Sequence, residues 1–128
     1  MSVVLITHDL GIVGEVCDRV LVMYAGEIIE SASVNDLFDN PKHPYTKTLL
    51  DSVLSIEGGD SWEKVSVKTG ALADNEDLES ALRARTSAET GCIYAATCSE
   101  RLEHCVQETP EFREASPGHV VACHLYLR

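Results

Sequence analysis

The sequence predicts an α/β protein, or α+β when the chain is taken as a fragment: the incomplete end of a sheet followed by a small cysteine-rich domain. Val3–Ile6 are consecutive apolar, mostly β-branched residues, typical of a strand buried on both faces of a parallel sheet. A helix pattern, two strand patterns and two further helix patterns follow as far as Leu54. Four of the five cysteines lie after residue 90. These three observations predict a sheet-forming first part, residues 1–54, and a cysteine-rich second part, residues 55–128.

The first part begins with a helix and a hairpin. Asp9 is a suitable N-cap for a short helix over residues 10–17, whose apolar residues recur at helical spacing. Strands over 19–24 and 27–30 flank Ala25-Gly26, and Gly26 supplies the positive φ that a short hairpin turn needs.

Two further helices follow the hairpin. Ser33 can cap a short helix through Phe38, and Asn40-Pro41 ends it. Pro44 then starts another helix at a position that tolerates its missing N–H. The apolar face expected for this helix consists of Tyr45, Leu49, Leu50, Val53 and Leu54. After residue 55 the patterns weaken, with a short strand expected over 62–67, a helix over 75–85, and a domain boundary at 55–60.

Composition excludes several classes of partner. The 128 residues carry a formal net charge of −11, spread over both parts, which disfavours binding to nucleic acid and to anionic lipid. No apolar run approaches the roughly 20 residues that cross a bilayer. Five cysteines without an export signal favour a reducing compartment, where metal ligation competes with disulfides.

A series of sequence blocks carries a family resemblance. They are Thr7-His8-Asp9-Leu10, Cys17-Asp18-Arg19-Val20, Met23-Tyr24-Ala25-Gly26-Glu27-Ile28-Ile29-Glu30 and Leu37-Phe38-Asp39-Asn40-Pro41-Lys42-His43-Pro44-Tyr45-Thr46. In this order they resemble the last third of an ABC-transporter ATPase domain, a P-loop ATPase fold. The His-Pro-Tyr segment resembles the C-terminal extension of ATPase subunits from oligopeptide and dipeptide importers.

The resemblance implies a role for His8. From the residues alone, His8 is either a ligand-facing group at a strand end or merely a polar strand terminus. In the family it corresponds to the switch histidine, which reaches the γ-phosphate of Mg-ATP and helps hold the attacking water. This sequence contains no Gly-x-x-x-x-Gly-Lys-Ser/Thr, no signature loop and no acidic strand end before Val3. We therefore expect no ATP hydrolysis by this chain alone.

The second part contains a cysteine constellation. Cys92, Cys98, Cys105 and Cys123 are separated by 5, 6 and 17 residues and form no Cys-x-x-Cys pair. Four thiolates at such spacings can bind zinc or an iron–sulfur cluster, while two disulfides or four free thiols are the alternatives. Cys17 lies on the apolar face of its helix and is expected to be a buried core thiol.

The same four cysteines also carry the resemblance. With Thr109-Pro110 and residues 119–123, they resemble the motif that ends many peptide-importer ATPases, where it is associated with a four-iron, four-sulfur cluster. Ala96-Thr97 stand where the family usually has Pro-Arg before the second cysteine. We expect the cluster to stabilise a small domain rather than to carry electrons. The histidines expected to be substitutes or to lie just outside the ligand set are His104, His119 and His124.

The resemblance also implies a biological setting. It implies a fragment of the ATP-binding subunit of an oligopeptide or dipeptide importer, cytoplasmic and peripheral to the membrane. The partners implied are a second ATPase subunit and the membrane permeases. The alternative is a free-standing iron–sulfur or zinc module with a regulatory or interaction role.

The chain taken alone raises a question of assembly. Because Val3–Ile6 lacks flanking strands, we expect a homodimer with residues 1–30 at the contact. The alternative is that this segment folds back onto the hairpin over 20–29.

Overall fold

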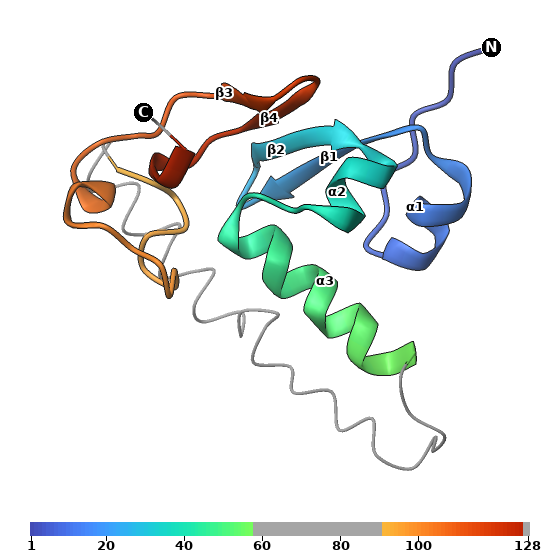
Figure 1. The fold of residues 1–128 in the computed structure, drawn as a ribbon, viewed down its shortest axis with the longest axis horizontal. Helices are drawn as coiled ribbons and strands as arrows, with labels where there is room; N and C mark the ends of the chain where they lie inside the picture. The colour runs from blue at the N-terminus through green and yellow to red at the C-terminus, as the bar shows by residue number, and fades with distance from the viewer. Residues whose placement is uncertain (58–90, 127–128) are drawn as a thin grey trace.

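A computed structural model describes residues 1–57 and 91–126 of the chain (Figure 1). Side chains are described for all of these residues except 53–57. Its elements are, in order, α1 (Leu10–Val16), β1 (Arg19–Tyr24), β2 (Glu27–Ser33), α2 (Val34–Asp39), α3 (Pro44–Glu57), the 3₁₀ turn η2 (Glu103–Val106), β3 (Arg113–Ser116), β4 (His119–Val121) and the 3₁₀ turn η3 (His124–Tyr126). Among these residues, no helix is long and apolar enough to cross a membrane.

One sheet joins the two parts of the chain. Its strand order is β1-β2-β4-β3, and every neighbouring pair is antiparallel. β4 comes from the cysteine-rich part and lies beside β2, with Glu30 opposite Val121 and Ser31 opposite Val120. Figure 1 shows the β3–β4 hairpin alongside the β1–β2 hairpin. The described residues therefore form an α+β arrangement, and the division at residue 55 stays a prediction.

The expected strand over Val3–Ile6 is wrong for this structure. Residues 1–9 form no strand, and the side chains of Val3, Val4, Leu5 and Ile6 are 75%, 89%, 47% and 93% exposed. A strand buried on both faces needs parallel neighbours, and the sheet among the described residues is antiparallel throughout. The segment does not fold back onto the β1–β2 hairpin either, since β2 is the only strand paired with β1 in this part of the chain.

The first helix and the hairpin are confirmed. Asp9 caps α1, its carboxylate accepting hydrogen bonds from the N–H groups of Gly11 (3.0 Å) and Ile12 (3.2 Å). Ala25 and Gly26 have φ values of 47° and 83°, the paired positive φ angles of a tight turn between antiparallel strands.

The next two helices are also confirmed. The Ser33 hydroxyl accepts from the Asp36 N–H (3.2 Å) at the start of α2, and α3 begins at Pro44. Leu50 of α3 is buried as expected, whereas Tyr45 and Leu49 are half-buried. Cys17 is half-buried rather than fully buried, because α1 ends at Val16 and leaves the thiol at the edge of the fold. The elements expected over 62–67 and 75–85 lie outside the described residues.

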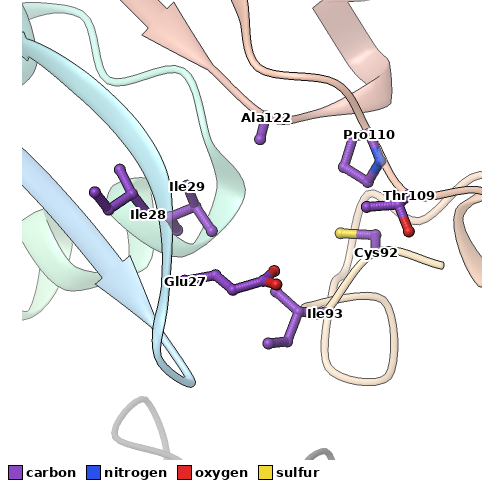
Figure 2. Close-up of a pocket in the computed structure, with 8 residues that line it drawn as sticks. All are labelled: Glu27, Ile28, Ile29, Cys92, Ile93, Thr109, Pro110 and Ala122. Carbon is purple, nitrogen blue, oxygen red and sulfur yellow. The ribbon is translucent and has the colours of Figure 1, made fainter. Parts of the chain in front are cut away.

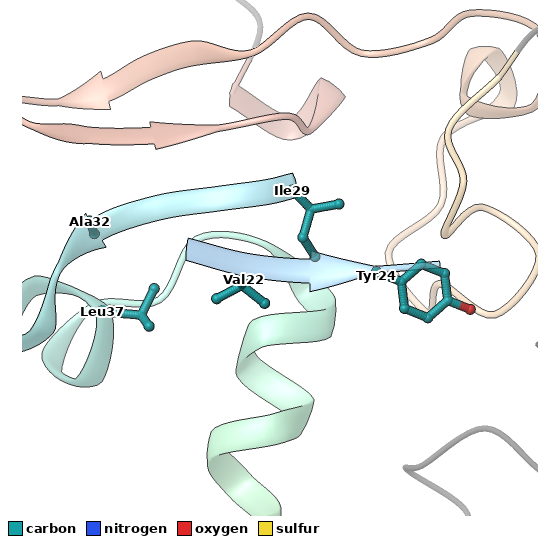
Figure 3. Close-up of a cluster of buried hydrophobic side chains, with 5 residues drawn as sticks. All are labelled: Val22, Tyr24, Ile29, Ala32 and Leu37. Carbon is teal, nitrogen blue, oxygen red and sulfur yellow. The ribbon is translucent and has the colours of Figure 1, made fainter. Parts of the chain in front are cut away.

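The main core lies between the β1–β2 hairpin and the helices. Figure 3 shows its buried members, which are Val22, Tyr24, Ile29, Ala32 and Leu37. Ile93 and Tyr94, next to the first cysteine of the constellation, pack against this core. The cysteine-rich part therefore shares a core with the hairpin as well as a sheet, and burial of apolar surface holds the two together.

Candidate functional site

His8 and the cysteine constellation lie in different parts of the structure. His8 is exposed in the irregular segment just before α1, where the Asp9 N–H donates to the Thr7 hydroxyl (3.0 Å). The cysteine-rich loops lie at the opposite end of the molecule from α1 (Figure 1). The two candidate sites of the sequence are thus not brought together.

Hydrogen bonds hold the loop segments around Cys92 and Cys105 together. The Cys92 N–H donates to the Cys105 carbonyl oxygen (2.7 Å), which closes the loop between these residues. The Thr109 hydroxyl bridges both backbone groups of Gly91 at 3.2 Å. The Leu102 N–H donates to Cys105 Sγ (3.4 Å) and orients that sulfur. All five cysteines, Cys17 included, are free of disulfides.

Burial raises the pKa values of three of the four thiols, and the charges of the other cysteines add to each rise. Burial raises the pKa of Cys123 to about 11, and the charges of Cys92, Cys98 and Cys105 add to the rise. Burial also raises the pKa of Cys92, and Cys105 and Cys98 contribute. Burial raises the pKa of Cys98 too, again with a contribution from Cys105. Every pair among the four therefore interacts, and placing four thiolates here requires a compensating positive charge.

A cation that sequence analysis missed lies beside this group. The positive charge of Arg101 opposes the rise in the pKa of Cys98, whereas the charge of Glu100 adds to it. Arg101 therefore places a positive charge near Cys98. In the family that the sequence resembles, the Pro-Arg pair before this cysteine usually supplies such a charge.

A metal site needs several ligands placed around one point. Among residues 1–57 and 91–126, no three His, Cys, Asp or Glu side chains are placed to hold a metal ion. The described residues therefore give no geometric support for a zinc ion or for a cluster at these cysteines.

Gly91 provides a test of how closely the cysteine loops pack. Its φ is 108°, and a Cβ there would lie 2.7 Å from the Val106 carbonyl oxygen and 3.2 Å from the Cys105 carbonyl oxygen. Gly91→Ala is expected to destabilise the protein by more than the about 1–3 kcal/mol that a strained backbone conformation costs. Gly118→Ala is the matched control, because its φ is 73° and nothing lies within 4 Å of the added Cβ. Urea unfolding measures both, and equal losses would contradict the close packing.

An aromatic cluster joins the cysteine loop to the His-Pro-Tyr segment. The ring of Tyr24 lies 4.8 Å from that of Tyr45 and 5.1 Å from that of Tyr94, between centroids. Tyr94 also lies 5.5 Å from both Tyr45 and His43. Such tilted and edge-to-face pairs stabilise beyond the area that they bury. The hairpin, the turn before α3 and the cysteine loop thus meet at one point.

His43 has a structural role in the turn before α3. It is 1% exposed, and its Nδ1 accepts from the Tyr45 N–H (3.0 Å) at the start of α3. Burial lowers the pKa of His43 to about 4; the charge of Glu30 opposes this shift and that of Lys47 adds to it. The ring is therefore neutral at neutral pH, which leaves Nδ1 free to accept.

The buried residue that sequence analysis missed is Glu30. Its side chain is fully buried on β2, and its two oxygens accept from the N–H groups of Lys42 (2.8 Å) and His43 (2.9 Å). The Oε1 atom also accepts from Nε2 of His119 at 2.5 Å. The pattern of β2 carries no signal for this residue, because residues 29–32 are buried in succession rather than alternately. The partners of Glu30 lie 12 to 89 residues away.

The other histidines are not placed as ligands in the cysteine site. His119 belongs to the Glu30 contact. The rings of His104 and His124 lie edge to face, 4.6 Å apart, and His124 Nε2 contacts the Glu108 carbonyl oxygen at 2.7 Å. His104 and His124 thus contact each other, and the role expected for them beside the cysteines stays a prediction.

A small pocket lies where β2 faces the cysteine loops. Figure 2 shows the Cys92 sulfur and the Glu27 carboxylate at its sides. The remaining lining residues are Ile28, Ile29, Ile93, Thr109, Pro110 and Ala122. Cys92 therefore lies beside β2 in mostly apolar surroundings.

Comparison with known proteins identifies the family. Residues 29–105, more than half of the chain, match the family described as "Oligopeptide/dipeptide transporter, C-terminal region". The Oligopeptide transport ATP-binding protein AppD of Bacillus subtilis (strain 168) is 38% identical over 125 residues, which are 98% of this chain and 34% of AppD. AppF, with the same description and organism, is 37% identical over 126 residues, 98% of this chain and 36% of AppF.

A third relative comes from another organism. The Probable peptide ABC transporter ATP-binding protein y4tR of Sinorhizobium fredii (strain NBRC 101917 / NGR234) is 40% identical over 122 residues, 95% of this chain and 33% of y4tR. The chain thus spans about a third of the length of the curated relatives that it matches. Because the family match covers more than half of the chain, the chain belongs to the oligopeptide/dipeptide transporter C-terminal region family.

Proposed function

We propose that this chain acts as the C-terminal part of the ATP-binding subunit of an ABC importer for oligopeptides or dipeptides. The observation that carries the proposal is the similarity to AppD and AppF along 98% of the chain. In the whole subunit, this part helps to couple ATP hydrolysis to import. Its partners are a second ATPase subunit and the membrane permeases, which hold it at the cytoplasmic face of the membrane.

His8 is the residue proposed to take part in hydrolysis. Its exposed imidazole, held just before the capped start of α1, can donate a hydrogen bond to the γ-phosphate of Mg-ATP. The other ring nitrogen is then available to a neighbour that orients the ring.

The four cysteines are proposed to hold one four-iron, four-sulfur cluster, with zinc as the less favoured occupant. Support comes from the interaction of each thiol with the other three and from the positive charge of Arg101. The cluster would supply the positive charge that stabilises four thiolates and would close the loops between them. This closure is a structural role.

The proposal is tested by replacing the corresponding C-terminal third of AppD with this chain in Bacillus subtilis. The chimera is expected to restore oligopeptide uptake to a strain lacking AppD, and His8→Ala in the chimera is expected to abolish it. Glu15→Gln is the control, since Glu15 is exposed on α1. The chain alone serves as the baseline, with no hydrolysis expected.

Two results would contradict this proposal. Uptake that survives His8→Ala would remove the proposed role of His8. A folded, membrane-associated chimera that hydrolyses no ATP, while the chain alone binds iron and sulfide, would favour the free-standing metal-binding module.

The chain alone is proposed to form a homodimer through residues 1–30. The apolar side chains of Val3–Ile6 are exposed, as are Leu21 and Met23 on the edge strand β1, and a second copy can cover them. Light scattering at low micromolar concentration is expected to give twice the monomer mass. A Val4→Lys and Ile6→Lys double variant is expected to be monomeric, and a folded monomer without these changes would rule out the dimer.

A further inference from the structure

The Glu30 contact links two distant segments through one buried carboxylate. Glu30 and His119 are 0% and 1% exposed, so neither group retains the hydration that stabilises it in water. A buried carboxylate persists only where donors replace that water. Here all the donors found are fixed: two backbone N–H groups of the turn before α3 and the ring of His119.

The His119 side of the contact leads directly to a cysteine. β4 runs from His119 to Val121, and the Ala122 N–H donates to the Ile29 carbonyl oxygen (2.9 Å). Cys123 is the next residue along the chain. The short segment from His119 to Cys123 is therefore held against β2, the strand that carries Glu30, so the position of Cys123 depends on the docking of β4.

The opposite side of the contact leads to the His-Pro-Tyr turn. The Lys42 and His43 N–H groups fix the backbone just before Pro44, the first residue of α3. The Lys42 carbonyl oxygen also accepts from the Tyr126 hydroxyl (2.9 Å), a second bridge from the C-terminal segment. Two contacts from the cysteine-rich part therefore hold this turn: His119 through Glu30, and the Tyr126 hydroxyl directly.

We propose that Glu30 is a positioning residue that couples the four-cysteine site to the His-Pro-Tyr turn, through His119 and β4. The occupant of the cysteine site is taken from the proposed function, whereas the coupling itself rests on the contacts above. Filling the site tightens the turn, and breaking the contact loosens Cys123, because such coupling is reciprocal.

The first test uses the full chain without a cluster. The rate of Cys123 alkylation by N-ethylmaleimide, relative to that of Cys17, is measured by mass spectrometry. Glu30→Gln and His119→Leu are expected to raise this ratio about tenfold, because Cys123 is 8% exposed only while β4 is held. His119→Gln can still donate to Glu30 and is expected to stay near the unmodified ratio. Glu15→Gln removes an exposed charge and is the matched control.

The internal reference makes this test decisive. A variant that merely unfolds exposes Cys17 and Cys123 together, and its alkylation ratio is then close to that of the denatured chain. In that case the coupling is tested by comparing the alkylation ratios of His119→Gln and His119→Leu. An unchanged ratio in folded Glu30→Gln and His119→Leu would overturn the coupling, whatever the site holds.

The second test uses anaerobically prepared protein with its iron and sulfide. Hydrogen exchange at the Lys42 and His43 amides is expected to be about tenfold slower with the cluster than without it, and this difference should vanish in His119→Leu. If the cluster binds but does not slow hydrogen exchange at these two amides, the coupling is overturned while the proposed occupant stands. Failure to assemble any cluster overturns the proposed occupant, and the alkylation test then decides the coupling.

Discussion

Replacing Cys105 by serine is expected to remove nearly all iron and sulfide from protein purified without oxygen. Cys105 is 9% exposed, its Sγ is oriented by the Leu102 N–H, and it interacts with each of the other three thiols. Serine is a harder and less acidic ligand, and three remaining thiolates hold a cluster poorly. Chemical analysis of iron and sulfide, together with the visible absorbance, measures the loss.

Cys17→Ser is the control for this experiment. Cys17 follows α1, at the opposite end of the molecule from the cysteine-rich loops, and its replacement is expected to leave the cluster in place (Figure 1). Zinc alone in the unmodified protein, or loss of the metal in Cys17→Ser, would contradict the cluster. Equal amounts of iron and sulfide in the unmodified protein would support it.

Leu37→Ala is expected to cause a large loss of stability. Leu37 is 0% exposed and lies in the core between α2 and the hairpin (Figure 3). Truncating a fully buried leucine costs about 2–5 kcal/mol, since transfer energy is lost and a cavity remains. That is a large fraction of the about 5–15 kcal/mol by which domains are stable. The midpoint of urea unfolding measures it.

Leu21→Ala removes the same atoms from a different environment. Leu21 on β1 is 57% exposed, so the change is expected to stay within about 0.5 kcal/mol. If both variants lost the same free energy, α2 would not pack on the hairpin as described.

Local signals were sufficient for the elements of the first part. Asp9 and Ser33 cap helices because their side chains satisfy nearby N–H groups, and Gly26 makes the hairpin turn because it tolerates positive φ. Each of these choices depends on contacts within a few residues, and each was predictable. The same holds for Pro44 at the first position of α3.

Val3–Ile6 shows where a local pattern is insufficient. Its apolar residues favour a strand that is buried on both faces, but such burial requires neighbouring strands from other parts of a sheet. In the part of the chain that the structure describes, no parallel neighbour is present, and the side chains are exposed. A hydrophobic pattern therefore predicts a preference for burial without supplying the partner.

For the candidate sites, the available groups could be predicted from local patterns: His8 before a capped helix, the His-Pro-Tyr turn, and four cysteines. The pairing of β4 with β2 and the burial of Glu30 between His43 and His119 could be found only in the folded chain. The physical reason is that the decisive hydrogen bond, from His119 to Glu30, joins residues 89 positions apart. No local propensity encodes such a pairing, because the buried carboxylate is stable only after both segments have docked.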